Sequence, residues 1–341
     1  MSLKLNGWIL GLMCGFSFST PVVFGARIAQ AAPSLAVVSK QDAVLQLFNS
    51  ATGRLEREYP LGFLPHEVLI SRKGGHIAVT NYGKDHVRSE APTNVPGRTV
   101  TIVRGDQPED AVAFNLDEAD CAPHGMAESA DGRRLYVTCE AQEKVIVFDV
   151  PTGRVLRTLA TAQAGSHMVV VSTDETRAYT SNFAAGSVTA IDIASGRILA
   201  QIPVGPGTEG ISLSPDARFV YASSVLGGFI AKIDTVTLKV VATAPTPKSP
   251  VRVIPTPDGS RLIVNSSAEG LMLVYRASDL SLEWSLPVGR QPIGLVVPSP
   301  RRAFVAAMLD HEIVEVDLES RRIAKRFGTA RKPDGIDMIS E

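Results

Sequence analysis

This 341-residue sequence lacks the features that are typical of several classes of function. Its 34 basic and 35 acidic residues almost cancel, and no basic run occurs, so the charge pattern of a nucleic-acid-binding protein is missing. The same balance gives no electrostatic reason for binding to an anionic membrane surface. The chain has only three cysteines and no Cys-x-x-Cys-His motif, which excludes covalent haem attachment of that type.

Local catalytic motifs are also missing. The Gly-x-Ser-x-Gly elbow of serine hydrolases is absent, and no serine has a histidine or aspartate in a suitable local context. No glycine-rich loop follows a strand and opens a helix, as phosphate binding would require. Acidic residues do not recur at the spacing of a calcium loop. The sequence therefore supports none of these three functions.

Residues 1–31 have the pattern of a cleaved signal peptide. Lys4 supplies the positive start, Trp8–Phe18 the apolar core, and Ala29–Ala31 a small-residue cleavage site. The apolar run is short for a membrane span, although an uncleaved anchor is the alternative interpretation. Cys14 lies in a poor match to a lipoprotein site. We therefore expect an exported mature protein, periplasmic or secreted, without stable insertion in a membrane.

The stretch Ala122–Leu159 shows the unit from which the rest of the chain is built. It contains four short apolar runs, and Asp131-Gly132 and Thr152-Gly153 provide turn signals between them. Glycine supplies the positive φ that a tight turn needs, so such pairs between β-branched runs indicate hairpins. The stretch predicts a four-stranded antiparallel meander.

Copies of this unit recur with a nearly constant period. The first strand of each copy begins at one of seven aligned segments: Pro65–Val68, Pro123–Met126, Ser166–Val169, Thr208–Ile211, Pro250–Val253, Pro292–Leu295 and Pro333–Ile336. From His124 onward the intervals are 43, 42, 42, 42 and 41 residues. A period in the low forties with four strands per unit is typical of a β-propeller.

The ends of the chain and one long interval complete the predicted fold. The N-terminal part supplies three strands without a first strand, and the C-terminal part supplies only a first strand, so together they make one blade. The result is an all-β, seven-bladed propeller in a single domain, residues 32–341. The first interval is 58 residues, which predicts an inserted loop at 84–97 that lies over the channel mouth as a lid.

The strand motifs resemble those of a known family. Leu135–Thr138, with 178–182 and 220–223 as looser copies, is similar to the repeat of the YVTN β-propellers, which include bacterial lactonase-like proteins with seven blades. The turns at Asp149–Gly153 and Asp192–Gly196 match the same pattern. The resemblance implies the propeller fold over residues 35–339. For function it implies a range, because such propellers include lactone hydrolases, cofactor-handling proteins and binding modules.

Two cysteines remain after the predicted signal peptide. Cys121 and Cys139 fall at the same end of adjacent predicted strands, so a disulfide is one expectation in an oxidising compartment. The alternative is that Cys139 stays a thiol near a functional site. The sequence leaves the choice open, because it does not give the geometry of the pair.

One aligned column collects the candidate metal ligands. Around the ring it reads Asp334, His66, His124, His167 and Glu209, followed by the apolar Val251 and Ile293. Imidazole nitrogens and carboxylate oxygens suit a divalent zinc, manganese or iron ion. Such an ion would polarise a carbonyl and lower the pKa of a bound water, and the apolar arc would receive the body of a substrate.

Other residues of the same face are candidates for supporting roles. His311 and His86 lie in loops where they would transfer protons, and Arg252 would hold a carboxylate or alkoxide. Two alternatives stay open: a metal-free ligand site, or a hydrogen-bonded structural ring. If the strand alternation is shifted by one residue, the channel lining becomes instead Glu67, Gly125, Met168, Gly210, Arg252, Gly294 and Gly335, without a metal set.

These patterns and the family resemblance lead to one functional expectation and one alternative. We expect a monomeric exported propeller that binds a small molecule at its channel mouth and, following the resemblance, hydrolyses a lactone or ester with a divalent metal. The alternative is a non-catalytic binding or scaffold module that recognises a partner protein or handles a cofactor.

Overall fold

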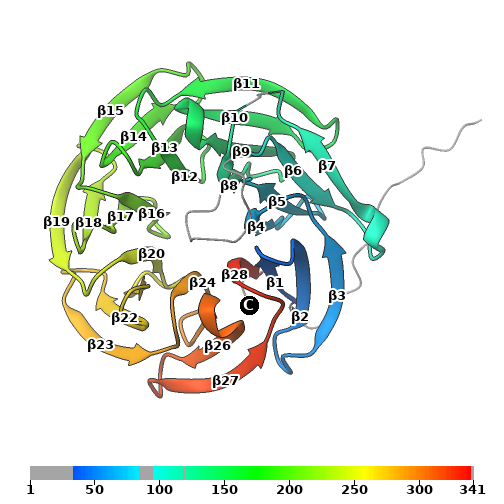
Figure 1. Cartoon of the computed structure of the whole chain (residues 1–341). Coiled ribbons are helices and arrows are strands. Elements are labelled where there is room, and N and C mark those ends of the chain that lie inside the picture. The colour runs from blue at the N-terminus through cyan, green and yellow to red at the C-terminus, as the bar shows by residue number, and fades with distance from the viewer. Residues whose placement is uncertain (1–33, 84–94, 118–119, 339–341) are drawn as a thin grey trace, which may run out of the picture.

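Turn-flanked runs of β-branched residues form seven antiparallel sheets of four strands in residues 34–83, 95–117 and 120–338, the part that the computed structural model describes. The sheets are arranged as blades around one axis (Figure 1). The seven-bladed propeller expected from the repeat is confirmed. The predicted signal peptide, His86 and most of the predicted insertion at 84–97 lie outside the described residues.

We number the blades by their innermost strands, which surround the channel. These are β4 (Pro65–Ile70), β8 (Pro123–Glu128), β12 (Ser166–Val171), β16 (Thr208–Leu213), β20 (Pro250–Pro255), β24 (Pro292–Ser299) and β28 (Pro333–Met338), for blades 1 to 7. The second strands, in the same blade order, are β5 (Ile77–Asn81), β9 (Arg134–Cys139), β13 (Arg177–Asn182), β17 (Phe219–Ser224), β21 (Arg261–Ser266), β25 (Arg302–Ala307) and β1 (Ser34–Ser39).

The third and outermost strands continue each blade toward solvent. The third strands are β6 (Thr99–Val103), β10 (Lys144–Asp149), β14 (Ser187–Asp192), β18 (Phe229–Asp234), β22 (Leu271–Arg276), β26 (Glu312–Asp317) and β2 (Val44–Asn49). The outermost are β7 (Ala111–Asn115), β11 (Arg154–Ala160), β15 (Ile198–Pro203), β19 (Lys239–Pro245), β23 (Leu282–Pro287), β27 (Arg322–Gly328) and β3 (Leu55–Pro60).

Helical structure in the described residues is confined to three short 3₁₀ turns. They are η1 (Pro108–Asp110), η2 (Glu140–Gln142) and η3 (Met308–Asp310). Among those residues, no helix combines the length and the apolarity needed to cross a lipid bilayer.

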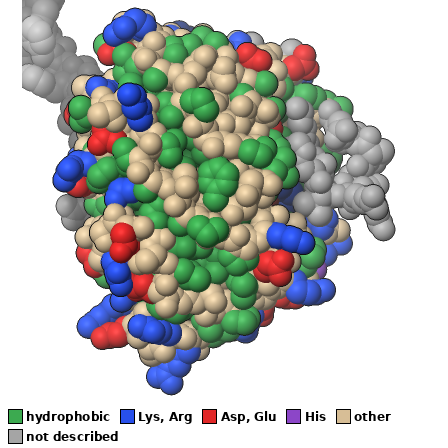
Figure 2. Space-filling view, turned by 90° about the vertical axis from the view of Figure 1, so that its left-hand side faces the viewer, with side chains coloured by type: hydrophobic (Ala, Val, Ile, Leu, Met, Phe, Trp, Pro, Cys, Tyr) green, Lys and Arg blue, Asp and Glu red, His purple; other side chains and the backbone are tan. Residues whose placement is uncertain are grey.

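Burial is greatest in the second and third strands of the blades and is lower in the outermost strands. In the second strand β9 five consecutive residues are buried, because neighbouring blades cover both of its faces. In the outermost strand β27 partly buried and exposed residues alternate along its whole length. Figure 2 views the molecule from the side of β15 and β19, where hydrophobic side chains are interspersed on the surface. One exposed hydrophobic residue of an outermost strand is Val241 of β19, which is 54% exposed.

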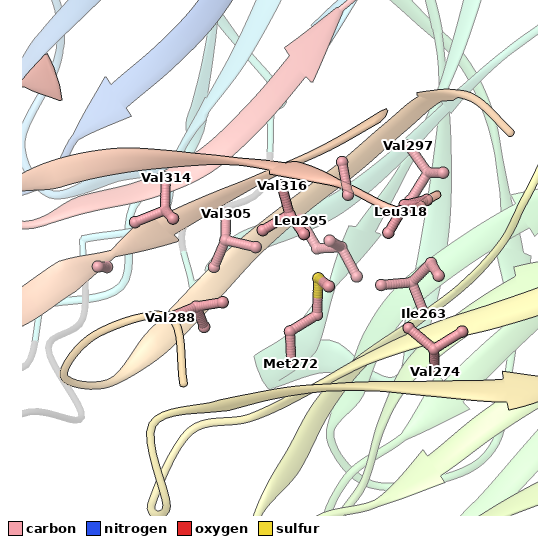
Figure 3. Close-up of a cluster of buried hydrophobic side chains, with 12 residues drawn as sticks. Ile263, Met272, Val274, Val288, Leu295, Val297, Val305, Val314, Val316 and Leu318 are labelled. Carbon is pink, nitrogen blue, oxygen red and sulfur yellow. The ribbon is translucent and has the colours of Figure 1, made fainter. Parts of the chain in front are cut away.

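Apolar side chains between adjacent blades hold the ring together. Figure 3 shows the contact between blades 5 and 6, where Ile263 and Met272 of one blade face Val305 and Val314 of the other. All four are fully buried. Truncating a buried side chain of this kind to alanine costs about 2–5 kcal/mol, so each contact between blades is a substantial part of the stability of the fold.

The two ends of the chain close the ring in blade 7. β28 pairs antiparallel with β1, and Leu35 lies opposite Met338 and Val37 opposite Ile336. The predicted shared blade is therefore present. Because β28 pairs with the side of β1 that β2 does not cover, β1 has no open edge in this blade.

A disulfide joins Cys121 and Cys139 at the start of blade 2. The sequence alone did not decide whether this disulfide exists, and it is present in the structure. Both side chains are fully buried and pack with Val137 and Ile146 in the apolar cluster between blades 1 and 2.

Neighbouring inner strands approach each other very closely at two glycines. A Cβ placed on Gly294 would lie 2.1 Å from the carbonyl oxygen of Asp334, and one on Gly335 would lie 2.3 Å from that of His66. Both obstacles are backbone atoms of the next inner strand. Any side chain at these positions would force adjacent blades apart.

This crowding predicts a specific cost for one small substitution. Gly294→Ala should lower the free energy of unfolding by about 1–3 kcal/mol, because the added methyl group must displace a neighbouring strand. The matched control is Gly328→Ala in the outermost strand β27, where the new Cβ would have no neighbour closer than 4.0 Å. Urea unfolding at pH 7 measures both. Equal stability of the two variants would contradict the crowding.

Candidate functional site

Three histidine rings form a tilted stack where the inner strands of blades 1 to 3 begin, with interplanar angles of 47° and 34° between successive rings. His66, His124 and His167 are each the second residue of their strand, after Pro65, Pro123 and Ser166. The ring centroids of His66 and His124 are 4.0 Å apart, and those of His124 and His167 are 3.7 Å apart. The structure therefore brings together the three imidazoles of the predicted column.

The central ring, His124, has nitrogens that the described protein leaves without a hydrogen-bond partner. The residue is only 1% exposed, and neither Nδ1 nor Nε2 has a partner among the described residues. Burial, together with the charges of His167 and His66, holds the pKa of His124 well below its ordinary value. A neutral imidazole with an available lone pair is the form that binds a metal.

Carboxylates flank the stack on the side of blade 3. The Nδ1 atom of His167 lies 3.2 Å from Glu140 Oε2, and its Nε2 atom lies 3.9 Å from Glu209 Oε1. Burial alone would lower the pKa of His167, but the hydrogen bond and charge of Glu140, with the charge of Glu209, raise it overall. Burial raises the pKa of Glu209. This side of the stack therefore favours a protonated ring beside two acids.

On the other side of the stack, a buried lysine contacts the predicted ligand Asp334. Lys40 Nζ lies 2.5 Å from Asp334 Oδ2, and the same oxygen is 3.6 Å from His66 Nε2. Burial, partly offset by the charge of Asp334, lowers the pKa of His66. Asp334 is thus next to the stack as predicted, but it already has a cationic partner.

Tyr82 covers the edges of two of the stacked rings. Its ring meets His66 and His124 edge-on, with centroid distances of 5.3 and 5.0 Å and interplanar angles of 83° and 85°. The side chain is fully buried, and burial together with the charge and hydrogen bond of Glu140 raises its pKa. The phenol therefore stays protonated and links the stack to Glu140.

Arg252, expected to hold a substrate carboxylate or alkoxide, has a carboxylate partner within the protein. Its guanidinium is bound by Glu67, which reaches it across the channel from β4, and it also contacts Met168 Sδ at 3.4 Å. The role of Arg252 toward a substrate stays a prediction. Sequence reasoning could not find the internal partner, because the two residues are 185 positions apart.

A cavity of about 710 Å³ runs along the inner strands of the propeller. Its lining includes four residues of the alternative column, Glu67, Met168, Arg252 and Gly294, and extends toward Pro257 and Asp337. The three stacked histidines are not among its lining residues. Which of the two columns faces a ligand stays a prediction.

Of the two loop histidines, only His311 lies in the described part of the chain. It follows η3 in the left-handed conformation, and its Nδ1 accepts a hydrogen bond from the backbone N–H of Lys332 at 3.1 Å. No contact among the described residues joins it to the three stacked rings. Its role in proton transfer, like that of His86, stays a prediction.

Three residues of the site share a position that the sequence reasoning did not weigh as ligands. Lys40, Tyr82 and Glu140 each come directly after the second strand of their blade, in blades 7, 1 and 2. The aligned repeat places this position on the same face as the histidines. The recurrence of this position in the sequence repeat could have been used to predict that these three residues lie at the site.

Ligand atoms gather in two overlapping groups within the described residues. One consists of His66, Glu67 and His124, the other of His124, Glu140 and His167, and within each the atoms lie within 4.8 Å of one another. His124 belongs to both. In the first group Glu67 is also bound by Arg252, which lowers its pKa despite its burial.

The opposite shifts of two stacked histidines predict their order of protonation. In chelator-treated protein, His167 should gain its proton at higher pH than His124, because the fold favours the charged form of the first and the neutral form of the second. Stability contributed by protonated His167 is therefore present below about pH 6.5 and is lost as the pH rises through the folded pKa of His167. Stability contributed by neutral His124 is present above about pH 6.5 and is lost as the pH falls through the folded pKa of His124. Ring NMR titration measures the order. Earlier protonation of His124 would contradict it.

The pair formed by Glu67 and Arg252 predicts a non-additive loss of stability. Arg252→Met should lower the free energy of unfolding by about 3–5 kcal/mol, because it leaves a buried carboxylate without its partner. Adding Glu67→Gln should recover part of that loss. A double-mutant cycle by urea unfolding at pH 7 tests this, and additive effects would contradict a coupled pair.

Comparisons with solved structures identify the same fold in several proteins. A putative 6-phosphogluconolactonase from Bacteroides uniformis ATCC 8492 is 13% identical, with a TM-score of 0.72, and covers 91% of this chain and 100% of its own. A periplasmic gluconolactonase of Pseudomonas aeruginosa is 19% identical, with a TM-score of 0.68, and the aligned region covers 91% of this chain and 99% of the gluconolactonase. The hydrazine synthase of Kuenenia stuttgartiensis is 17% identical, with a TM-score of 0.68, and the aligned region covers 82% of this chain and 90% of the hydrazine synthase chain.

Family membership rests on the sequence rather than on these distant structures. A search of curated proteins found no match to the chain. The model of the family described as lactonase, 7-bladed beta-propeller, matches residues 39–280, which is more than half of the chain. The chain therefore belongs to the family of seven-bladed lactonase propellers.

Proposed function

We propose that this protein hydrolyses a small lactone or ester at the stacked histidines, with the help of a divalent zinc, manganese or iron ion. The observation that carries the proposal is His124, a buried neutral imidazole whose two nitrogens have no partner among the described residues. Membership of the lactonase family supports the reaction class. The solved gluconolactonase-type structures share the fold and agree with that class.

The donor set fits such an ion. Two candidate groups of three ligands meet at His124, and both combine imidazole nitrogens with a carboxylate. His66 and His167 would complete the histidine set, with Glu140, Glu209 or Asp334 as carboxylate ligands. A divalent ion held there would polarise the carbonyl of a lactone and make a bound water more acidic.

The remaining residues of the cluster would prepare the site for that reaction. Glu140 fixes the orientation of the His167 ring through its hydrogen bond, as carboxylates do for metal-binding histidines. Burial raises the pKa of Glu209 toward the range in which a carboxyl group can accept and return a proton. Val251 and Ile293, beside Glu209 in the ring order, would face the body of the substrate.

Export of the protein is part of the proposal. The signal-peptide pattern of residues 1–31 supports it, and so does the disulfide, since such bonds persist in oxidising compartments. We propose a periplasmic or secreted protein that acts as a monomer on a small molecule.

A binding role without catalysis is the second candidate. The observation that favours it is internal pairing, because Lys40 contacts Asp334 and Arg252 contacts Glu67. A cluster whose charges are satisfied in this way can serve to hold blades together. The ligand or partner protein would then bind elsewhere on the propeller.

Metal content and turnover decide between these candidates. Purified wild-type protein should contain a stoichiometric first-row metal, or take it up from zinc, manganese or iron salts, and should hydrolyse at least one member of a panel of lactones and esters. His124→Ala should lose at least tenfold in metal affinity and turnover. His311→Ala is the matched control for metal content, since its ring contacts the backbone of Lys332.

The outcome that contradicts the hydrolase is equally clear. If neither the wild type nor the histidine variants bind metal after refilling, while circular dichroism shows an intact fold, the metal-dependent reaction is wrong. The binding role would then be the remaining candidate.

A further inference from the structure

In several blades, the side chain of the last residue of the second strand is bonded to the segment that precedes the inner strand. In blades 4 and 5 this residue is a serine: Ser224 Oγ donates to the carbonyl of Pro206 at 2.7 Å, and Ser266 Oγ donates to that of Lys248 at 2.6 Å. In blade 7, Ser39 Oγ donates to the carbonyl of Ala330 at 3.3 Å. A side-chain hydrogen bond thus fixes the same junction in three blades.

Blade 2 replaces this hydrogen bond with a covalent bond. Cys139 is the last residue of β9, and Cys121 stands two residues before the inner strand β8, as Pro206 and Lys248 stand before β16 and β20. Two backbone hydrogen bonds already join the segments here, from Glu140 N–H to Ala122 O and from Ala141 N–H to Cys121 O, both 3.2 Å long. The disulfide therefore adds rigidity at a junction that backbone bonds have already formed.

The residues next to the two cysteines belong to the candidate site. His124 lies three residues after Cys121, and Glu140 directly follows Cys139. His124, Glu140 and His167 form one of the two candidate ligand groups. Two backbone segments carry two of its three ligands, and the disulfide links those segments in addition to their backbone hydrogen bonds. In the other group, His66 and Glu67 lie together on β4, and only the shared His124 lies near the disulfide.

We infer that the disulfide between Cys121 and Cys139 is a positioning element of the candidate site, holding His124 and Glu140 at the separation that joint ligation with His167 requires. This inference rests on the proposed function and specifies it, because it selects the group with His124, Glu140 and His167 as the place of the ion. The closure of the propeller does not depend on this bond, since β28 and β1 close the ring in blade 7.

The test uses a variant that restores the junction found in other blades. In Cys121→Ser/Cys139→Ser, the hydroxyl introduced at the end of β9 can donate a hydrogen bond as Ser224 and Ser266 do, so the propeller should keep its circular dichroism spectrum and cooperative unfolding. Zinc affinity should fall at least tenfold, as expected when an element that orients ligands is lost. The ring NMR signals of His124 and His167 should move in metal-free protein, while that of His311 should not.

A matched control separates positioning from a general loss of stability. Ile263→Val removes one buried methyl group between blades 5 and 6, away from the histidines, and should lower the unfolding temperature without changing zinc affinity or the histidine signals. If the double serine variant does not fold, mild reduction of folded wild-type protein gives the same measurement.

The result that overturns the inference is a double serine or reduced protein with unchanged His124 and His167 signals. The disulfide would then serve stability alone. Failure of the proposed function looks different, because wild-type protein would bind no zinc, while the ring signals of metal-free protein would still report whether the disulfide positions these residues.

Discussion

The space around the propeller axis is the constraint on which the rest of the structure depends. Seven inner strands converge there, and the layer that follows the histidines cannot hold seven side chains. Only Glu67, Met168 and Arg252 extend into it, from blades 1, 3 and 5, and the other four positions are glycines. The three long side chains meet one another, so the charge of Arg252 is balanced within the protein.

The same crowding shapes the electrostatics of the histidine cluster one layer away. Burial lowers the pKa of His66 and His124, whereas in His167 the effect of burial is outweighed by the hydrogen bond and charge of Glu140 and the charge of Glu209. The three stacked rings therefore differ in chemistry although they occupy equivalent positions in the repeat. Charged neighbours at the ends of the second strands, Lys40 near His66 and Glu140 beside His167, contribute to that difference. The repeat thus determines where the three histidines lie, and the residues that differ between blades determine how readily each ring is protonated.

The sequence could predict the fold because the repeat is local and periodic, and each blade carries its own turn signals. It could also align the three histidines, since equivalent positions in successive blades lie side by side. It could not predict the partner of Arg252, because the contact with Glu67 crosses the channel between strands that the period does not relate. Nor could it decide the state of Cys121 and Cys139, which depends on the distance between the end of β9 and the segment before β8 rather than on spacing along the chain.

The shared blade also determines the order in which the molecule can be completed. β1 is near the beginning of the described chain, and its partner β28 is at the end, almost 300 residues later. Contacts between residues so far apart in sequence form late, because the intervening chain must be ordered first. Until then the apolar strand β1 has an unpaired edge that can pair with another chain. A partly synthesised copy that contains β1 but lacks β28 is therefore exposed to aggregation at the free edge of β1, and pairing with β28 removes that exposure.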